Sequence, residues 1–344
     1  MSGLQVEKGP EYDIAVTSRV RLARNFADLP FSAKMSAKHQ DELVKRMKEI
    51  ISSNLDYGKL MYADITSMHN IDRISLMERH LISPDLAESK GNSGAFVNET
   101  ENVSIMVNEE DHIRLQALFS GVQLEKAYKV CDEIDTFISD KADYAFDDKY
   151  GYLTSCPTNL GTAMRASVML HLPALVMTGY IKSILESCNK VGVTVRGIYG
   201  ENSEAVGDMF QVSNQISLGR NEEETIASID GICKQIIDRE KALRFQLYKQ
   251  DVYRFEDKIF RSLGLLLNAR IISTQECFKL LSDVRLGVSM GIIKDIDIGI
   301  LNEILVLSQP ATLQKIAGKQ LREDERDIKR AEQIRAKIQN TEVK

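Results

Sequence analysis

The stretch GAFVNETENVSIMVNEEDH, residues 94–112, contains two short runs of strand-forming residues on either side of the polar segment ETEN. β-Branched and aromatic residues favour strands, and a polar turn between two such runs is typical of a hairpin. The sequence therefore predicts a hairpin over 95–107. Its second strand runs directly into NEEDH, residues 108–112, so a cluster of acids follows the end of a strand.

The segments on either side of this hairpin mix helical and strand patterns. Apolar residues recur at helical spacing over 36–54, after a possible cap at Ser36, and again over 121–139. We also expect a hairpin over 144–155, strands over 192–199 and 209–215, a short helix from Arg165 to Leu170 that Pro173 ends, and a helix over 222–245 capped by Asn221 and Glu224. This order predicts an α+β fold, an antiparallel sheet flanked by helices.

The pattern changes near residue 250. Apolar residues of 252–266 step by three and four, and strand signals are absent beyond them. Ser273 with Glu276 predicts a capping box for a later helix, and Pro310 suits the first turn of another. The sequence therefore predicts two domains, an α+β domain over 1–250 and an all-helical C-terminal domain over 251–344.

Composition limits the class of protein. The 344 residues are 43% hydrophobic and 27% charged, with a formal net charge of −6 and no Lys/Arg block that stands clear of acids. This balance is typical of a globular protein and argues against nucleic-acid binding. No segment approaches the roughly 18 uninterrupted apolar residues of a membrane span, and no targeting pattern opens the sequence. We expect a cytoplasmic protein whose five widely spaced cysteines are reduced thiols.

Any phosphate binding must rely on side chains, because the sequence has no P-loop, no Rossmann fingerprint and no protein-kinase signature. Arginine forks suit bidentate contact with phosphate oxygens. Arg19 and Arg21 stand two apart in the extended-looking segment TSRVRLARN, so we expect both on one face. Taken singly, such arginines are usually surface residues. The candidates are Arg19, Arg21, Arg114, Arg165 and Arg196.

Three segments give these arginines a recognisable context. NEEDHIR at 108–114, CPTNLGTAMRASVMLHLP at 156–173 and RGIYGENSE at 196–204 resemble the active-site motifs of the phosphagen (guanidino) kinases. The resemblance spans roughly residues 10 to 245. It implies the catalytic domain of that family, a glutamine-synthetase-like antiparallel sheet. It also implies an enzyme that uses ATP and Mg²⁺, without a metal site built from protein side chains.

The resemblance also implies roles for single residues. The five arginines match the family's ATP-phosphate ligands, and His80 is expected to help place the nucleotide, whereas His112 serves structure or nucleotide placement. Glu110 and Glu201 match the carboxylates that hold the acceptor guanidinium, and Cys156 matches the reactive cysteine beside it. The chemistry is reasonable, because a guanidinium with a pKa above about 12 is a poor nucleophile until it loses a proton. A thiolate nearby orients it electrostatically, and a buried structural cysteine is the simpler alternative.

The sequence differs at two points from the phosphagen kinases that act on free metabolites. Metabolite-directed members carry an extra helical domain ahead of their STRVR-like segment, whereas Arg19 arrives almost at once here and a helical region follows the kinase region. An acceptor site without that lid admits an arginine presented by a protein, an arrangement that resembles the bacterial protein-arginine kinases. Met169 stands where arginine and creatine kinases tend to place a histidine, so the resemblance does not specify how adenine packs.

The tail EDERDIKRAEQIRAK, residues 323–337, contains a candidate second site. Arg326 and Arg330 are i,i+4 neighbours beside Asp327, and the string RDxxRA, which ends at Ala331, resembles the phosphoarginine-binding motif of the bacterial protein-arginine kinases. Paired arginines hold a phosphate while an aspartate holds a guanidinium. We therefore expect an allosteric phosphoarginine site. Without the resemblance, a solvated charged helix face is the ordinary interpretation.

These features together predict an ATP-dependent protein-arginine kinase of a stress response. Its partners include arginine-bearing substrate proteins and, by resemblance, the Clp protease system that degrades them and the class III stress repressor. An activator protein and further copies of this chain are candidates that the sequence leaves open. A free-arginine kinase is the nearest alternative, and a non-catalytic adaptor that only reads phosphoarginine is another. Retention of Glu110, Glu201, Cys156 and all five arginines argues against the adaptor.

Overall fold

The computed structural model describes residues 8–53, 58–199 and 205–339. Contacts divide the chain into two compact units. The first comprises Met1–Gly9, Thr17–Val168 and Ser213–Asp230, and the second comprises Pro10–Val16, Met169–Val212 and Gly231–Lys344. These units differ from a single cut at residue 250, because residues 169–212 and 231–250 cluster with the C-terminal helices. No helix among the described residues combines the length and apolar character needed to cross a membrane.

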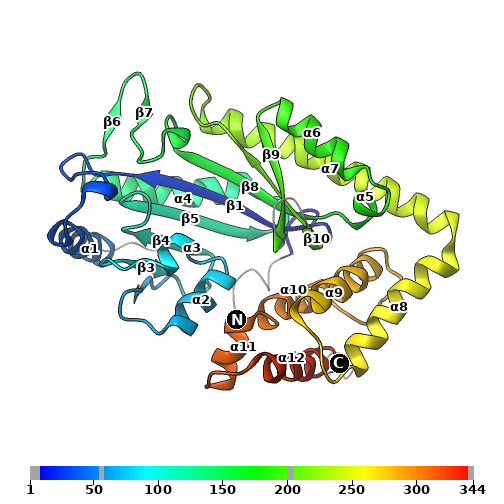
Figure 1. Ribbon diagram of the computed structural model, residues 1–344. Helices are drawn as coiled ribbons and strands as arrows, with labels where there is room; N and C mark the ends of the chain where they lie inside the picture. Colours follow the sequence, from blue (N-terminus) through cyan, green and yellow to red (C-terminus); the bar gives the residue numbers. More distant parts are fainter. Residues whose placement is uncertain (1–7, 54–57, 200–204, 340–344) are drawn as a thin grey trace. The chain divides into compact units, whose positions relative to one another are not determined.

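An eight-stranded sheet has the order β2-β3-β4-β5-β1-β8-β10-β9 (Figure 1). Its strands are β1 Ala15–Arg24, β2 Met61–Asp64, β3 Gly94–Val97, β4 Val103–Val107, β5 Ile113–Ser120, β8 Met164–His171, β9 Val193–Tyr199 and β10 Ala205–Asn214. Strands β2 to β5 pair antiparallel in sequence, and β5 pairs antiparallel with β1. The predicted antiparallel sheet is confirmed. A separate ribbon joins β6 (Phe146–Asp147) to β7 (Gly151–Tyr152), as expected for a hairpin over 144–155.

The predicted hairpin over 95–107 is formed by β3 and β4. Phe96 lies opposite Ile105 in the register. The Asn98 side chain stabilises the turn, because its Oδ1 accepts the backbone N–H groups of Asn102 and Val103, each at 3.0 Å. Both strands are buried along their length, so the acidic segment that follows them starts from a fixed support.

Strand β1 gives the TSRVRLARN segment two distinct faces. Val20 and Leu22 are buried, whereas Arg19 and Arg21 are only partly buried and alternate with them. Successive side chains of a strand point to opposite faces of the sheet. The predicted common face for Arg19 and Arg21 is therefore confirmed. Arg24 has the other parity, is buried, and forms an ion pair with Asp135 at 2.7 Å.

The first unit contains the two helices predicted over 36–54 and 121–139, now α1 Ala37–Ser52 and α4 Leu124–Ser139, and two shorter ones that were not predicted, α2 Asn70–Glu78 and α3 Pro84–Ala87. Ser36 caps α1, because its Oγ accepts the His39 N–H while the His39 ring accepts the Ser36 N–H. Helix α4 packs on the sheet through its apolar face, where the buried Cys131 thiol lies 3.6 Å from the Val20 carbonyl oxygen.

One predicted element is wrong. Residues 164–171 form strand β8, not a short helix from Arg165 to Leu170, and all of them except Arg165 are buried. The strand lies between β1 and β10 in the sheet. A buried strand lacks the strict alternation of polar and apolar residues, so periodicity alone does not distinguish this segment from a buried helix. Pro173 does not end a helix. It begins α5 (Pro173–Met177), where the first turn needs no N–H from it.

The second unit contains the C-terminal helices. After α5 and α6 (Ile181–Lys190), the helices are α7 Glu222–Gln250, whose residues up to Asp230 belong to the first unit, α8 Val252–Asn268, α9 Thr274–Ser289, α10 Ile298–Leu307, α11 Pro310–Ala317 and α12 Glu323–Gln339. All regular elements described after residue 250 are helices, as predicted. Ser273 caps α9 and Pro310 stands in the first turn of α11. Leu281, Val284 and Ile334 belong to a buried core that also takes in Met169 and Met209.

Candidate active site

A cavity of about 250 Å³ in the first unit gathers residues from three separate motifs. Its lining residues are Arg21, Leu22, Ala23, Glu109, Glu110, Asp111, Arg114, Cys156, Thr158, Asn159, Ala163, Met164 and Arg165. Strands β1, β5 and β8 supply the arginines, and the loops 108–112 and 156–163 supply the acids and the thiol. Sequence positions about 140 residues apart, such as Arg21 and Arg165, therefore meet at one site.

The cationic side of this cavity is crowded with arginines. Register places Arg114 of β5 opposite Ala23 of β1. Burial lowers the pKa of Arg21 well below its usual value, and the positive charges of Arg19, Arg114 and Arg165 lower it further. Within the described part of the chain, the buried Nε of Arg21 has no hydrogen-bond partner. Guanidinium groups held together in this way attract anions with several oxygen atoms.

Two adjacent glutamates, Glu109 and Glu110, have different burial and contacts at the cavity. The Glu109 side chain is only 1% exposed and forms an ion pair with Arg114 at 2.5 Å. The backbone N–H of Glu110 donates to Glu109 Oε2 at 2.9 Å, and the Glu110 side chain is exposed at the cavity. Partial burial raises the pKa of Glu110, and the neighbouring charges of Asp111 and Glu109 raise it further. Glu110 is therefore the carboxylate that is disposed to take a proton.

Asp111, which the sequence reasoning did not single out, joins the acidic loop to its surroundings. Its side chain is buried and accepts hydrogen bonds from Asn25 Nδ2 and from the backbone N–H of Ser155, both at 2.7 Å. Asn25 Oδ1 in turn accepts the N–H of His112 at 2.9 Å. These bonds connect the end of β1, the NEEDH loop and the residue before Cys156. The string of three acids was the available signal, but which acid is buried depends on the turn of the loop.

Cys156 stands at the start of the short 3₁₀ helix η3 (Pro157–Asn159) and is partly exposed. Its Sγ lies 3.0 Å from Thr158 Oγ1, and its carbonyl accepts the Thr154 hydroxyl at 2.9 Å. The other four cysteines are buried. Cys156 is therefore the thiol that the cavity presents to a ligand, in the same lining as Glu110.

The two candidate histidines have different environments. Burial lowers the pKa of His80 to about 4, with Arg19 and Arg21 adding to the effect, so its ring is neutral beside the arginines. His112 is fully buried, its Nδ1 accepts the Phe26 N–H at 2.9 Å, and its Nε2 lies 2.8 Å from the Pro30 carbonyl oxygen. Both ring nitrogens of His112 are thus engaged, which gives it a structural role.

Arg196 is an exposed residue of β9 in the second unit, and Glu201 lies outside the described residues. Met169 is buried in the core of the second unit. Among the described residues, no group of three or more His, Cys, Asp and Glu side chains is arranged to hold a metal ion.

The expected paired-arginine face of the tail needs a correction. Arg330 and Ala331 on α12 are buried, whereas Arg326 and Asp327 are partly exposed. Arg330 donates through Nε to the Ser308 carbonyl at 2.8 Å, through Nη1 to the Ile272 carbonyl at 2.7 Å, and to Asp327. The two arginines do not form one exposed pair, because Arg330 satisfies the backbone of neighbouring segments instead.

Two family models divide the chain near the boundary between α7 and α8. A model described as the C-terminal catalytic domain of ATP:guanido phosphotransferases matches residues 42–243. Another, described as the C-terminal domain of the protein-arginine kinase McsB, matches residues 253–344. The first match contains the acidic loop and the Cys156 loop, and the second contains the tail motif.

Two relatives named protein-arginine kinase are similar along nearly the whole chain. The Bacillus subtilis protein is 45% identical over 340 residues, 98% of this chain and 93% of that protein. The Halothermothrix orenii protein is 46% identical over 331 residues, 96% of this chain and 95% of that protein. Among solved structures, the duplicated taurocyamine kinase of Schistosoma mansoni with bound transition-state-analogue components has a TM-score of 0.61 at 27% identity, covering 72% of this chain and 36% of that one.

Proposed function

Because the chain belongs to the ATP:guanido phosphotransferase family, we propose that it transfers the γ-phosphoryl group of ATP to the guanidinium of arginine side chains in proteins. The observation that carries this proposal is the single cavity in which Arg21, Arg114 and Arg165 meet Glu110 and Cys156. Relatives named protein-arginine kinase support arginine in a protein as the acceptor.

The cationic cluster would hold the triphosphate. Arg21, Arg114 and Arg165 offer planar donors to phosphate oxygens, and neutralising the phosphates favours transfer of the γ-phosphoryl group. Mg²⁺ would enter bound to phosphate oxygens of the nucleotide and share this neutralisation. Neutral His80 lies among the charges of Arg19 and Arg21 and adds no positive charge of its own.

The acidic side of the cavity would hold the acceptor. Glu110 accepts a proton from the guanidinium, the freed nitrogen forms a bond to the γ-phosphorus, and the bond from that phosphorus to the β–γ bridging oxygen breaks as ADP leaves. Cys156 lies in the same lining and would orient the planar guanidinium by charge when it is a thiolate. Holding the acceptor nitrogen next to the γ-phosphorus supplies much of the rate acceleration.

We further propose that α12 contributes to phosphoarginine binding through Arg326 and Asp327, with Arg330 and Ala331 supporting the site from within the core. The match of residues 253–344 to the C-terminal domain of McsB supports a shared role for this region. Substrate proteins marked with phosphoarginine for the Clp protease system, the class III stress repressor among them, are the proposed partners, together with an activator protein and further copies of this chain.

A direct assay tests the acceptor. The protein is incubated with ATP and Mg²⁺ and with either free arginine or an unfolded arginine-rich protein, and the products are analysed by mass spectrometry for acid-labile phosphate on arginine. We expect phosphoarginine in the protein substrate and little in the free amino acid. Phosphorylation of free arginine alone would identify a metabolite kinase, and binding of phosphoarginine without any transfer would identify an adaptor.

A further inference from the structure

Strand β10 contains two consecutive residues in the left-handed backbone region. Gly207 has φ 68° and Asp208 has φ 55°. Glycine adopts this conformation freely, whereas a residue with a Cβ needs surroundings that hold it there. A Cβ on Gly207 would lie 2.9 Å from the carbonyl oxygen of Phe278, so the strand passes close to the backbone of α9 at this point. Asp208 is therefore strained at a place where the chain has little freedom.

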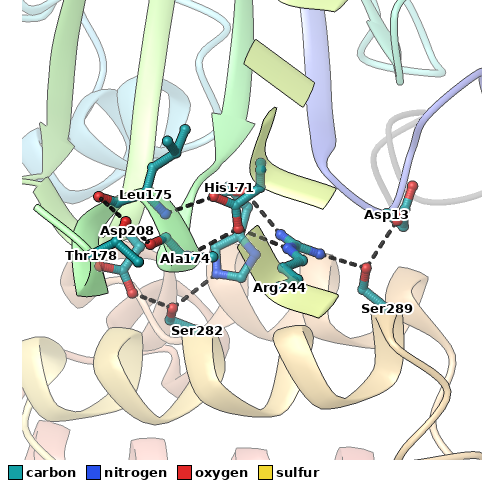
Figure 2. A network of polar contacts seen from close by, with 10 residues as sticks. Asp13, His171, Ala174, Leu175, Thr178, Asp208, Arg244, Ser282 and Ser289 are labelled. Carbon is teal, nitrogen blue, oxygen red and sulfur yellow. Dashed lines mark hydrogen bonds and ion pairs between the residues drawn. The ribbon is translucent and has the colours of Figure 1, made fainter. Parts of the chain in front are cut away.

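The side chain of Asp208 is anchored by a residue of α9. Ser282 Oγ donates to Asp208 Oδ2 at 2.6 Å, and His171 Nε2 lies 2.8 Å from the same Oγ (Figure 2). Because the hydroxyl gives its one proton to the carboxylate, His171 must donate Nε2–H to it. The three side chains thus form a chain of hydrogen bonds with one direction, from His171 through Ser282 to Asp208.

The histidine at the start of this chain is itself held rigidly. Its carbonyl accepts Arg244 Nη2 at 3.0 Å, and Arg244 Nη1 donates to Ser289 Oγ at 2.7 Å (Figure 2). Burial lowers the pKa of His171 well below its usual value, and the charges of Arg244, Arg285 and Lys258 act in the same direction. His171 therefore stays neutral, and it offers Ser282 a fixed donor.

Among the described residues, Ser282 is the hydrogen-bond donor to the Asp208 side chain, and Lys258 and Lys279 act on it through charge. The Asp208 carbonyl accepts the Leu172 N–H at 2.9 Å, which fixes the strand but not the side chain. On another side Asp208 borders a cavity of about 640 Å³ that Met177 and Lys258 also line, so close packing does not hold it there. The backbone bond to Leu172 and the hydrogen bond from Ser282 together hold this non-glycine residue in the left-handed conformation, and Ser282 is the one that acts through the side chain.

We propose that Ser282 is a positioning residue for phosphoryl transfer. It fixes the backbone of β10 at Asp208, and β10 pairs with β9, the edge strand that carries Arg196. Ser282 falls in the C-terminal family region, and Asp208 and Arg196 fall in the catalytic one. The C-terminal helices thereby set the geometry of a strand of the kinase region. This inference rests on the proposed function and on the phosphate-binding role of Arg196 that the resemblance to the phosphagen kinases implies.

A cycle of variants tests the proposal, because glycine at position 208 needs no anchor. In the full-length protein, Ser282→Ala should lower kcat/KM for phosphorylation of an unfolded protein by at least about tenfold, since small misplacements near a reacting group are costly. It should also speed hydrogen exchange over residues 205–212. Ser282→Thr keeps the hydroxyl and should restore both readouts. In an Asp208→Gly background, Ser282→Ala should change either readout by less than about twofold.

The two readouts separate this inference from the proposed function. Suppose that Ser282→Ala speeds hydrogen exchange only when position 208 is aspartate, and that the protein phosphorylates no arginine. The positioning contact would then be supported and the proposed function rejected. Equal losses from Ser282→Ala in both backgrounds would overturn the proposal, because the hydroxyl would then act through something other than the left-handed conformation. Unchanged exchange and activity in Ser282→Ala would overturn it as well. Thermal unfolding of each variant confirms that all are folded when compared.

Discussion

At the scale of single residues, Glu109 and Glu110 show how neighbours with the same chemistry take different roles. Glu109 is buried against Arg114, whereas Glu110 faces the cavity. Glu110→Gln should lower turnover by about 100-fold or more, because the proton acceptor is lost, and should leave ATP affinity within a few-fold. Steady-state kinetics and nucleotide titration measure the two effects. Near-normal turnover would exclude Glu110 as the base.

The matched control is Glu109→Gln, which removes the partner of Arg114 and should weaken ATP binding together with turnover. The pH profile adds a second check on the wild type. Glu110 must be ionised to accept a proton, so activity falls as pH drops through its pKa. Because that pKa is raised in the folded protein, the acidic limb should lie above the usual carboxyl range and move to lower pH in Glu109→Gln.

At the scale of elements, Asp111 connects the end of β1 to two loops of the cavity. Asp111→Ala would leave the Ser155 N–H and one bond of Asn25 unsatisfied, so we expect a loss of about 2 to 4 kcal/mol in the free energy of unfolding and a fall in turnover. Asp111→Asn keeps an acceptor oxygen and should recover most of the stability. Urea denaturation and kinetics measure both variants, and equal stability of Asp111→Ala and wild type would show that the loops are held by other contacts.

At the scale of the whole molecule, α12 is attached to the helical core by Arg330. Arg330→Ala would leave the carbonyls of Ser308 and Ile272 unsatisfied, which should lower the free energy of unfolding by about 3 kcal/mol. Arg326→Ala, at a partly exposed position of the same helix, should change it by less than about 0.5 kcal/mol.

A binding experiment with phosphoarginine distinguishes the roles of Arg326 and Arg330. Calorimetry in a Glu110→Gln background, which prevents turnover, should show that Arg326→Ala loses phosphoarginine binding while its fold stays intact. If Arg326→Ala binds normally, the tail motif is a structural feature of the helical core alone. Arg330→Ala then serves as the control for losses that arise from destabilisation.

Much of the local structure follows from the sequence. The hairpin over 95–107, the alternation of β1, the caps at Ser36, Asn221 and Ser273, and the helical region after residue 250 all depend on contacts between residues close in the chain. The periodicity of apolar residues and the residues at turns and caps indicate such local structure. The family and the candidate arginines also followed from sequence strings, since the motifs are contiguous.

The tertiary structure decided what distant contacts determine. Residues 164–171 became a strand because β1 and β10 flank them, and this largely buried segment, which contains Arg165, Ser167 and His171, has no periodicity strong enough to oppose that. Arg24 and Arg330 became buried anchors, although their sequence neighbours Arg21 and Arg326 remain partly accessible. Which side chain is buried depends on the partner that long-range packing brings to it, and no local pattern specifies that partner.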